Sequence, residues 1–152
     1  MTTTSHPCLF CAIAQRQCPA HIVYEDDHLV AFLDIGPIRP GHVQIIPRDH
    51  YPTFDDLTAE LASRIIILGQ RLARILKATH QVSRAAFLFT GSDVAHAHAH
   101  VLPLVAPTDI TSRRYIAEEN VTFRPITRPS DEELGKVAFT LREALKSRDT
   151  SP

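Results

Sequence analysis

The longest regular pattern in the sequence runs from residue 55 to residue 79. Apolar residues recur there at steps of three and four positions, and basic side chains fall largely on the opposite side. The apolar positions are Leu57, Leu61, Ile65, Leu68, Leu72 and Ile75. This spacing predicts one long amphipathic helix with a single face turned to a core. The rest of the fold has to provide the surface on which that face packs.

Shorter segments elsewhere have the length and composition of β-strands. They are residues 21–25, 28–34, 42–47 and 85–90. Residues 8–17 are expected to form a short helix. Residues 131–147 are expected to form a second amphipathic helix, because Ser130 and Glu133 match the capping-box pattern. Strands with few crossover helices favour an α+β fold, with an antiparallel sheet of about five strands, one long helix packed on it and a C-terminal helix.

Composition limits the classes of partner. With 152 residues and 44% hydrophobic content, the chain is long enough for one globular domain with a core. A net charge of -1 and the lack of a Lys/Arg-rich run argue against a nucleic-acid partner. No apolar run approaches the roughly 18 residues of a membrane span, and the first residues lack the apolar segment of a signal peptide. We therefore expect a cytoplasmic protein without a membrane partner.

Three of the nine histidines alternate with alanines, at His96, His98 and His100. On a helix the middle histidine would point away from the other two, whereas on a strand all three would share one face. Pro103 and the nearby turn at Gly91 favour a strand. Three imidazoles spread over roughly 13 Å of a straight strand cannot easily bind one metal. We therefore expect them to have different roles; the alternative is a histidine-rich surface strand or an adventitious metal binder.

Three cysteines are present, Cys8, Cys11 and Cys18. Their odd number, without a signal peptide, argues against a disulfide framework. Cys8 and Cys11 form a C-x-x-C motif, which is typical of a redox pair or of half a metal site. The motif alone leaves both interpretations open.

Two motifs together resemble the histidine triad (HIT) family. The first is 96-HAHAHVL-102, which is similar to the family signature of three histidines separated by hydrophobic residues. The second is the segment 8–50, which resembles the family's C-x-F-C opening, V-Y-E-D strand, A-F-x-D-I-x-P turn and P-G-H…I-P-x-x-H segment. The resemblance covers roughly residues 8–104. Residues 105–152 carry no motif that we assign, and we expect 1–152 to be a single HIT domain.

The resemblance implies a nucleotide hydrolase or nucleotidyltransferase that attacks an α-phosphate. The substrate would be a purine nucleotide, such as a nucleoside phosphoramidate, a dinucleoside polyphosphate or an adenylylated molecule. By the family pattern His98 is the nucleophile and forms a covalent nucleotidyl-histidine, with its other ring nitrogen held by a backbone carbonyl. His100 contacts the phosphate or the leaving group. A neutral imidazole suits this step because it is a better nucleophile than water and forms a labile phosphoramidate. The resemblance also implies a homodimer.

The segment 34–42 resembles the nucleotide-binding lip of the family. The resemblance implies that Asp34 binds the ribose hydroxyls and that His42 lies near the phosphates. The residues expected to sandwich the base are Phe10, Phe32 and Ile35. Three structural alternatives stay open: Phe32 as a core residue, Asp34 as a turn cap and His42 as a surface residue.

Some branches of the family hold a structural zinc ion, and with its C-x-F-C motif this chain resembles a bacterial-type member of such a branch. The ligands in those branches are the two cysteines, the histidine after I-P-x-x-H and the first triad histidine. The matching residues are Cys8, Cys11, His50 and His96. Two thiolates and two imidazoles suit tetrahedral zinc; the alternative is a pair of buried thiols without metal. Cys18 has no place in this set and is expected to be a packing residue.

The sequence departs from the family pattern just before and after the triad. Residues 87–100 lack the asparagine and the G-Q-[ST] element, and the loop looks shortened. Thr90 and Ser92 are candidates for substitute hydroxyls. Leu104 stands where many relatives have an arginine, and the candidates to replace its charge are Arg113 and Arg114. The phosphate contacts are left open, and so are two other functions: a slow nucleotide-binding regulatory module and a zinc-stabilised interaction protein.

Overall fold

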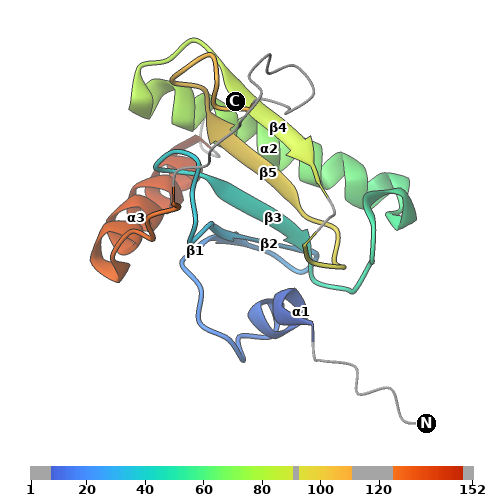
Figure 1. The fold of residues 1–152 in the computed structure, drawn as a ribbon. Helices are drawn as coiled ribbons and strands as arrows, with labels where there is room; N and C mark the ends of the chain where they lie inside the picture. Colours follow the sequence, from blue (N-terminus) through green and yellow to red (C-terminus); the bar gives the residue numbers. More distant parts are fainter. Residues whose placement is uncertain (1–7, 91–92, 111–124, 149–152) are drawn as a thin grey trace, which may run out of the picture.

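The computed structural model describes residues 8–90, 93–110 and 125–148 (Figure 1). Its elements are α1 (Leu9–Ala14), β1 (Ile22–Glu25), β2 (Leu29–Leu33), β3 (Val43–Pro47), the 3-10 turn η1 (Phe54–Asp56), α2 (Ala59–His80), β4 (Ala85–Phe89), β5 (Ala99–Pro103) and α3 (Asp131–Arg148). The strands lie in the order β1-β2-β3-β5-β4, and every neighbouring pair is antiparallel. The predicted α+β fold is confirmed, with five strands, one long helix and a C-terminal helix.

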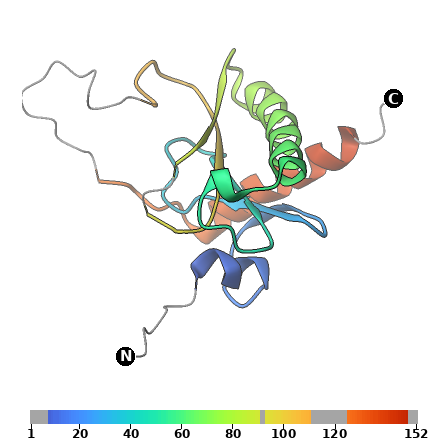
Figure 2. The ribbon, with the colours of Figure 1, turned by 90° about the vertical axis from the view of Figure 1, so that its right-hand side faces the viewer.

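Alternating side chains divide the sheet into two faces. On β2, Leu29, Ala31 and Leu33 join a core cluster with α2 and α3. Val30 and Phe32 point the other way and join a cluster with α1. Helices α2 and α3 therefore cover one face, and the short helix α1 lies against the other (Figure 2).

The long helix α2 begins later than the pattern predicts. Its N-cap is Thr58, whose side-chain oxygen accepts a hydrogen bond from the backbone N–H of Leu61 at 3.2 Å. Residues 54–56 form the separate turn η1 instead. The predicted apolar stripe is confirmed over the helix, where the buried members are Ile65, Leu68, Leu72 and Ile75. Neither α2 nor any other helix of the described ranges is long and apolar enough to span a membrane.

Helix α3 is confirmed almost as predicted. The backbone N–H of Glu133 donates to Ser130 Oγ at 3.2 Å, and the N–H of Ser130 donates to Glu133 Oε2 at 2.8 Å, which is the predicted capping box. Its buried residues join the same core cluster as α2; they are Leu134, Ala138, Leu141 and Leu145. Part of the segment without a motif therefore completes the core.

The expectation of one strand through the histidine triad is wrong for two of its three members. β5 begins at Ala99, so only His100 lies in the strand. Before it the backbone bends, because the N–H of Ala97 donates to the carbonyl of Tyr51 at 2.6 Å and the N–H of His96 donates to Val94 at 2.8 Å. These bonds keep His96 and His98 out of the hydrogen-bond ladder of the sheet.

Helix α1 is shorter than the predicted 8–17, and its C-terminal end is tied down by Arg48. The guanidinium donates to the carbonyl of Ala14 at 2.7 Å through Nη1 and to the carbonyl of Asp26 at 2.6 Å through Nε. Cys18 is half-buried against the same cluster as α1, which confirms it as a packing residue.

Candidate functional site

His98 is held in one tautomer by the main chain. The residue is only 1% exposed, and Nδ1 lies 2.7 Å from the carbonyl oxygen of His96. A carbonyl can only accept, so Nδ1 carries the proton and the neutral ring keeps a lone pair on Nε2. The backbone contact expected from the family resemblance is present. The rings of His98 and His100 are 5.0 Å apart.

A chain of hydrogen bonds orients His100. The backbone N–H of Ile38 donates to His42 Nδ1 at 3.2 Å, so the proton of His42 is on Nε2. That nitrogen donates to His100 Nδ1 at 2.9 Å, and His100 Nε2–H donates to Thr90 Oγ1 at 3.1 Å. Burial lowers the pKa of His42 to about 4 and also lowers the pKa of His100. Both rings are therefore neutral at pH 7, and His100 presents an N–H donor.

Two structural alternatives were left open, Asp34 as a turn cap and His42 as a surface residue, and the structure supports only the first. His42 is only 3% exposed, so the surface interpretation is wrong. Asp34 Oδ1 accepts from the N–H of Gly36 at 2.7 Å, so the turn-cap interpretation is right as a structural role. Its other oxygen, Oδ2, accepts from Gln44 Nε2 at 2.6 Å and lies 3.8 Å from His42 Nε2. Asp34 therefore borders the same histidine cluster.

Two of the three residues expected to contact a base lie together. The ring of Phe10 is 5.5 Å from that of Phe32 and 5.1 Å from that of His98, edge to face in both cases. Both phenylalanines are buried in the cluster on the α1 side, so the core interpretation of Phe32 is right as a structural role. Ile35 is 54% exposed on the loop after β2. The two rings form an apolar wall beside His98.

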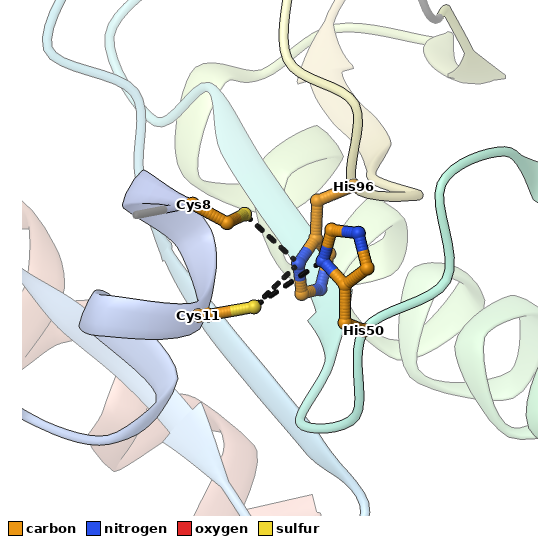
Figure 3. A group of neighbouring side chains, drawn as sticks. All are labelled: Cys8, Cys11, His50 and His96. Carbon is orange, nitrogen blue, oxygen red and sulfur yellow. Dashed lines mark hydrogen bonds between the residues drawn. The ribbon is translucent and has the colours of Figure 1, made fainter. Parts of the chain in front are cut away.

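The four expected metal ligands converge (Figure 3). Cys8 is the N-cap of α1 and Cys11 lies within that helix. His50 approaches from the segment after β3 and His96 from the bend before β5. Their ligand atoms all lie within 4.8 Å of one another. Three Sγ–Nδ1 distances are 3.3 Å, 3.5 Å and 3.5 Å. Tetrahedral zinc with bonds of about 2.3 Å to sulfur and about 2.0 Å to nitrogen places such atoms about 3.5 Å apart. The residues present therefore fit zinc.

His96 belongs to both clusters. Its Nε2–H donates to the carbonyl of Pro47 at 3.0 Å, which leaves Nδ1 facing the two sulfurs. Metal-bound histidines commonly make such an outer contact. Its main-chain carbonyl meanwhile holds His98.

Burial, with a smaller contribution from Cys8, raises the pKa of the Cys11 thiol to about 11, and a bound cation would instead favour the thiolate.

Sequence reasoning missed two contacts that shape the lip. Arg39 donates to Asp109 Oδ1 from Nη2 at 2.7 Å and from Nε at 2.9 Å, which ties residues 34–42 to the segment after β5 and helps lower the pKa of Asp109 to about 2. Gln44 contacts Asp34, as described above. A polar residue between His42 and the apolar end of β3 was the available signal for Gln44. Nothing local pointed to the Arg39 pair.

Several expected residues lie elsewhere. Ser92, Arg113 and Arg114 are outside the described residues. Leu104 pairs through its backbone N–H with the carbonyl of Arg84 at 3.0 Å. A cavity of about 530 Å³ lies between the lip and the start of α3, lined by Leu33, Pro40, Leu134 and Val137 among others. Asp34 and His42 reach it but His98 and His100 do not, so the assignment of the site rests on the histidine chemistry.

Comparisons with a family model, with known sequences and with solved structures agree with one another. A HIT domain model matches residues 15–106. An uncharacterised HIT-like protein of Mycobacterium tuberculosis is 34% identical over 95% of this chain and 97% of its own length. An adenylylsulfatase of Arabidopsis thaliana is 31% identical over 67% of this chain and 54% of its own length. The crystal structure of a zinc-bound histidine triad family protein from Mycobacterium smegmatis matches with a TM-score of 0.73 at 27% identity, over 96% of this chain and 98% of that one.

The family model spans more than half of the chain, and it includes the three alternating histidines at 96–100. The relative from Mycobacterium tuberculosis matches nearly end to end. The chain belongs to the histidine triad family.

Proposed function

We propose that this protein hydrolyses or transfers a purine nucleotide at its α-phosphate through a covalent nucleotidyl-histidine on His98. The observation that carries the proposal is the 2.7 Å bond from His98 Nδ1 to the His96 carbonyl, which leaves the lone pair of Nε2 free. Beside it, His100 presents an N–H donor. A nucleophile next to a preorganised donor suits a two-step displacement at phosphorus. A relative named as an adenylylsulfatase supports a hydrolase of this class.

The reaction proceeds in two displacements. His98 Nε2 attacks phosphorus, the P–N bond forms, and the leaving group departs with the electron pair of its bond to phosphorus. The ring becomes cationic, and its Nδ1–H bond to the His96 carbonyl strengthens. His100 Nε2–H exchanges Thr90 for a phosphoryl oxygen, where charge develops. Water then attacks phosphorus, and the electron pair of the P–N bond returns to His98 Nε2 and restores the neutral ring. The proton that the water loses passes to solvent, from which the leaving group takes up its own.

The nucleoside binds across the same face of the sheet. The base lies against Phe10 and Phe32, with Ile35 closing over it from the exposed loop. The ribose hydroxyls bind Asp34. The α-phosphate then reaches His98, because the Phe10 ring is already in contact distance of that imidazole.

Zinc in this protein is proposed to be structural. Cys8, Cys11, His50 and His96 would hold it, and when bound it supplies the charge that keeps both thiolates ionised. The zinc-bound relative of known structure supports this assignment. The reacting groups are the chain's own residues. While the ring of His96 would bind the metal, its main-chain carbonyl holds His98 in its tautomer.

A homodimer is proposed through the edge of the sheet at β4. Edge strands offer unpaired backbone groups to a second chain. Large apolar side chains are exposed on β4, on α2 and on the turn before it; they are Phe54, Ile66, Ile67 and Phe87. Ile67→Glu should shift the sedimentation coefficient to that of a monomer, while a wild type that is itself monomeric would refute the proposal.

The test is hydrolysis of adenosine 5′-phosphoramidate by the wild type and by His98→Ala. His28→Ala is the matched control, because that histidine is exposed. The wild type and the control should release AMP, and His98→Ala should retain zinc and its melting temperature without turnover. A His98→Ala rate above about 5% of wild type would exclude His98 as the nucleophile. AMP binding without turnover would favour a regulatory module, and zinc content without AMP binding would favour an interaction protein.

A further inference from the structure

Gln44 occupies the middle of a row of side chains across the sheet. It pairs directly with Phe32 on β2 and with His100 on β5. Residues directly opposite in antiparallel strands point to the same face. Gln44 therefore lies between the apolar wall and the imidazole that presents a donor to phosphate. In every nucleotide the sugar lies between the base and the α-phosphate, so a bound nucleotide has its sugar over Gln44.

The nitrogen end of the Gln44 amide holds Asp34. It donates to Asp34 Oδ2 at 2.6 Å, and a carboxylate can only accept, so the amide nitrogen has to face it. The backbone N–H of Gly36 donates to the other oxygen at 2.7 Å. Each carboxylate oxygen thus has one protein donor and keeps a second acceptor position. The carboxylate is fixed in orientation at both oxygens.

The oxygen end of the same amide has no such contact. Gln44 Oε1 is buried and has no hydrogen-bond partner among the described residues. A buried, unpaired acceptor destabilises a fold. Methionine would fill nearly the same space without that loss, and the neighbours on β3, Val43, Ile45 and Ile46, are apolar and buried. What the amide provides and methionine cannot is the donor to Asp34.

We propose that Gln44 is a specificity-determining residue, which fixes Asp34 so that its two oxygens accept one hydrogen bond each from the two hydroxyls of a ribose. The inference rests on the proposed function, because it requires a nucleotide at this site. A 2′-deoxyribose offers one hydroxyl fewer, and one oxygen of the fixed carboxylate then loses a partner. A carboxylate that is free to turn adapts to the single hydroxyl and discriminates less.

The test is equilibrium binding of AMP and of 2′-deoxy-AMP, measured by calorimetry. The wild type should prefer AMP by about 10-fold or more, and Gln44→Met should reduce that ratio at least about 3-fold. The melting temperature of Gln44→Met should equal or exceed that of wild type, because the unpaired acceptor is gone. Gln70→Met is the matched control on the exposed side of α2 and should keep the wild-type ratio.

A second variant tests the hydrogen-bond donor of Gln44 separately from the size of its side chain. Gln44→Glu keeps the size of the side chain but turns the donor into a like charge beside Asp34, so it should also lower the AMP preference. An unchanged ratio in either variant at Gln44 overturns the inference and leaves the proposed function in place. A wild type that binds neither nucleotide overturns both.

Discussion

Acid should destabilise this protein through His42 in particular. The ring is buried and neutral, and it accepts from Ile38 and donates to His100. Burial lowers its pKa from 6.5 to about 4; Asp34 nearby acts in the opposite direction and His100 in the same one. An unfolded chain protonates this histidine near pH 6.5. The contribution of the neutral ring is therefore fully present above pH 6.5 and is lost as the pH falls toward 4.

The size of the effect follows from these two pKa values. Between pH 7 and pH 5 the unfolded chain takes up most of a proton at this position and the folded chain takes up little. The free energy of unfolding should fall by about 2 kcal/mol over this interval from His42 alone. That is a large fraction of the stability of a typical domain.

The assay is urea unfolding of the wild type and of His42→Gln at pH 7 and pH 5, in one metal buffer. Glutamine keeps a polar group at the position but does not titrate. The variant should lose about 2 kcal/mol less than the wild type on acidification. The candidate zinc ligands His50 and His96 are the same in both proteins, so the contribution of the candidate metal site cancels in the comparison. Equal losses in the two proteins would refute the reasoning.

Two other predictions concern the candidate metal site and the long helix. Cys8→Ser should lower zinc content and melting temperature together, measured by mass spectrometry of the metal and by calorimetry, while Cys18→Ser should change neither strongly; a lower zinc content at unchanged stability would contradict a structural metal. Gly69→Ala should destabilise by about 1 kcal/mol or more despite the better helix propensity of alanine, because its Cβ would lie 2.5 Å from the Phe87 ring. Urea unfolding of Gly69→Ala checks this, and a gain in stability would show that the ring moves aside freely.

Much of the fold could be predicted because the signals are local. The apolar period of α2 and the Ser130–Glu133 capping box each depend on residues a few positions apart, and both are confirmed. The start of α2 was placed too early because an apolar period alone does not reveal that Thr58 caps the helix. The strand expected through His96 fails because a carbonyl far back in the chain, that of Tyr51, takes the N–H of Ala97.

The residues of the candidate site could be predicted better than the hydrogen bonds between them. The resemblance to the family placed the metal-ligating set together, and the structure brings these residues together. His100 is oriented by a hydrogen bond from His42, which lies 58 positions away in the sequence. No local pattern contains that contact. The local signal for the link from Gln44 to Asp34 is a polar residue in an apolar strand. That signal does not identify Asp34 as the partner, since both residues also have ordinary structural explanations on a strand and a turn.

Phe10, one of the two rings of the apolar wall, is carried by the shortest α-helix of the described residues. Helix α1 has 6 residues, and a helix this short is not stable in isolation. Arg48 holds its C-terminal end, and the two cysteines that flank Phe10 lie at the metal cluster. The core under α2 and α3 does not include α1. Local unfolding of α1 would therefore remove Phe10 from His98 while most of the molecule stays folded. Amide hydrogen exchange should begin in α1, and a sample that looks native by its overall spectrum can still lack the Phe10 ring at the candidate site.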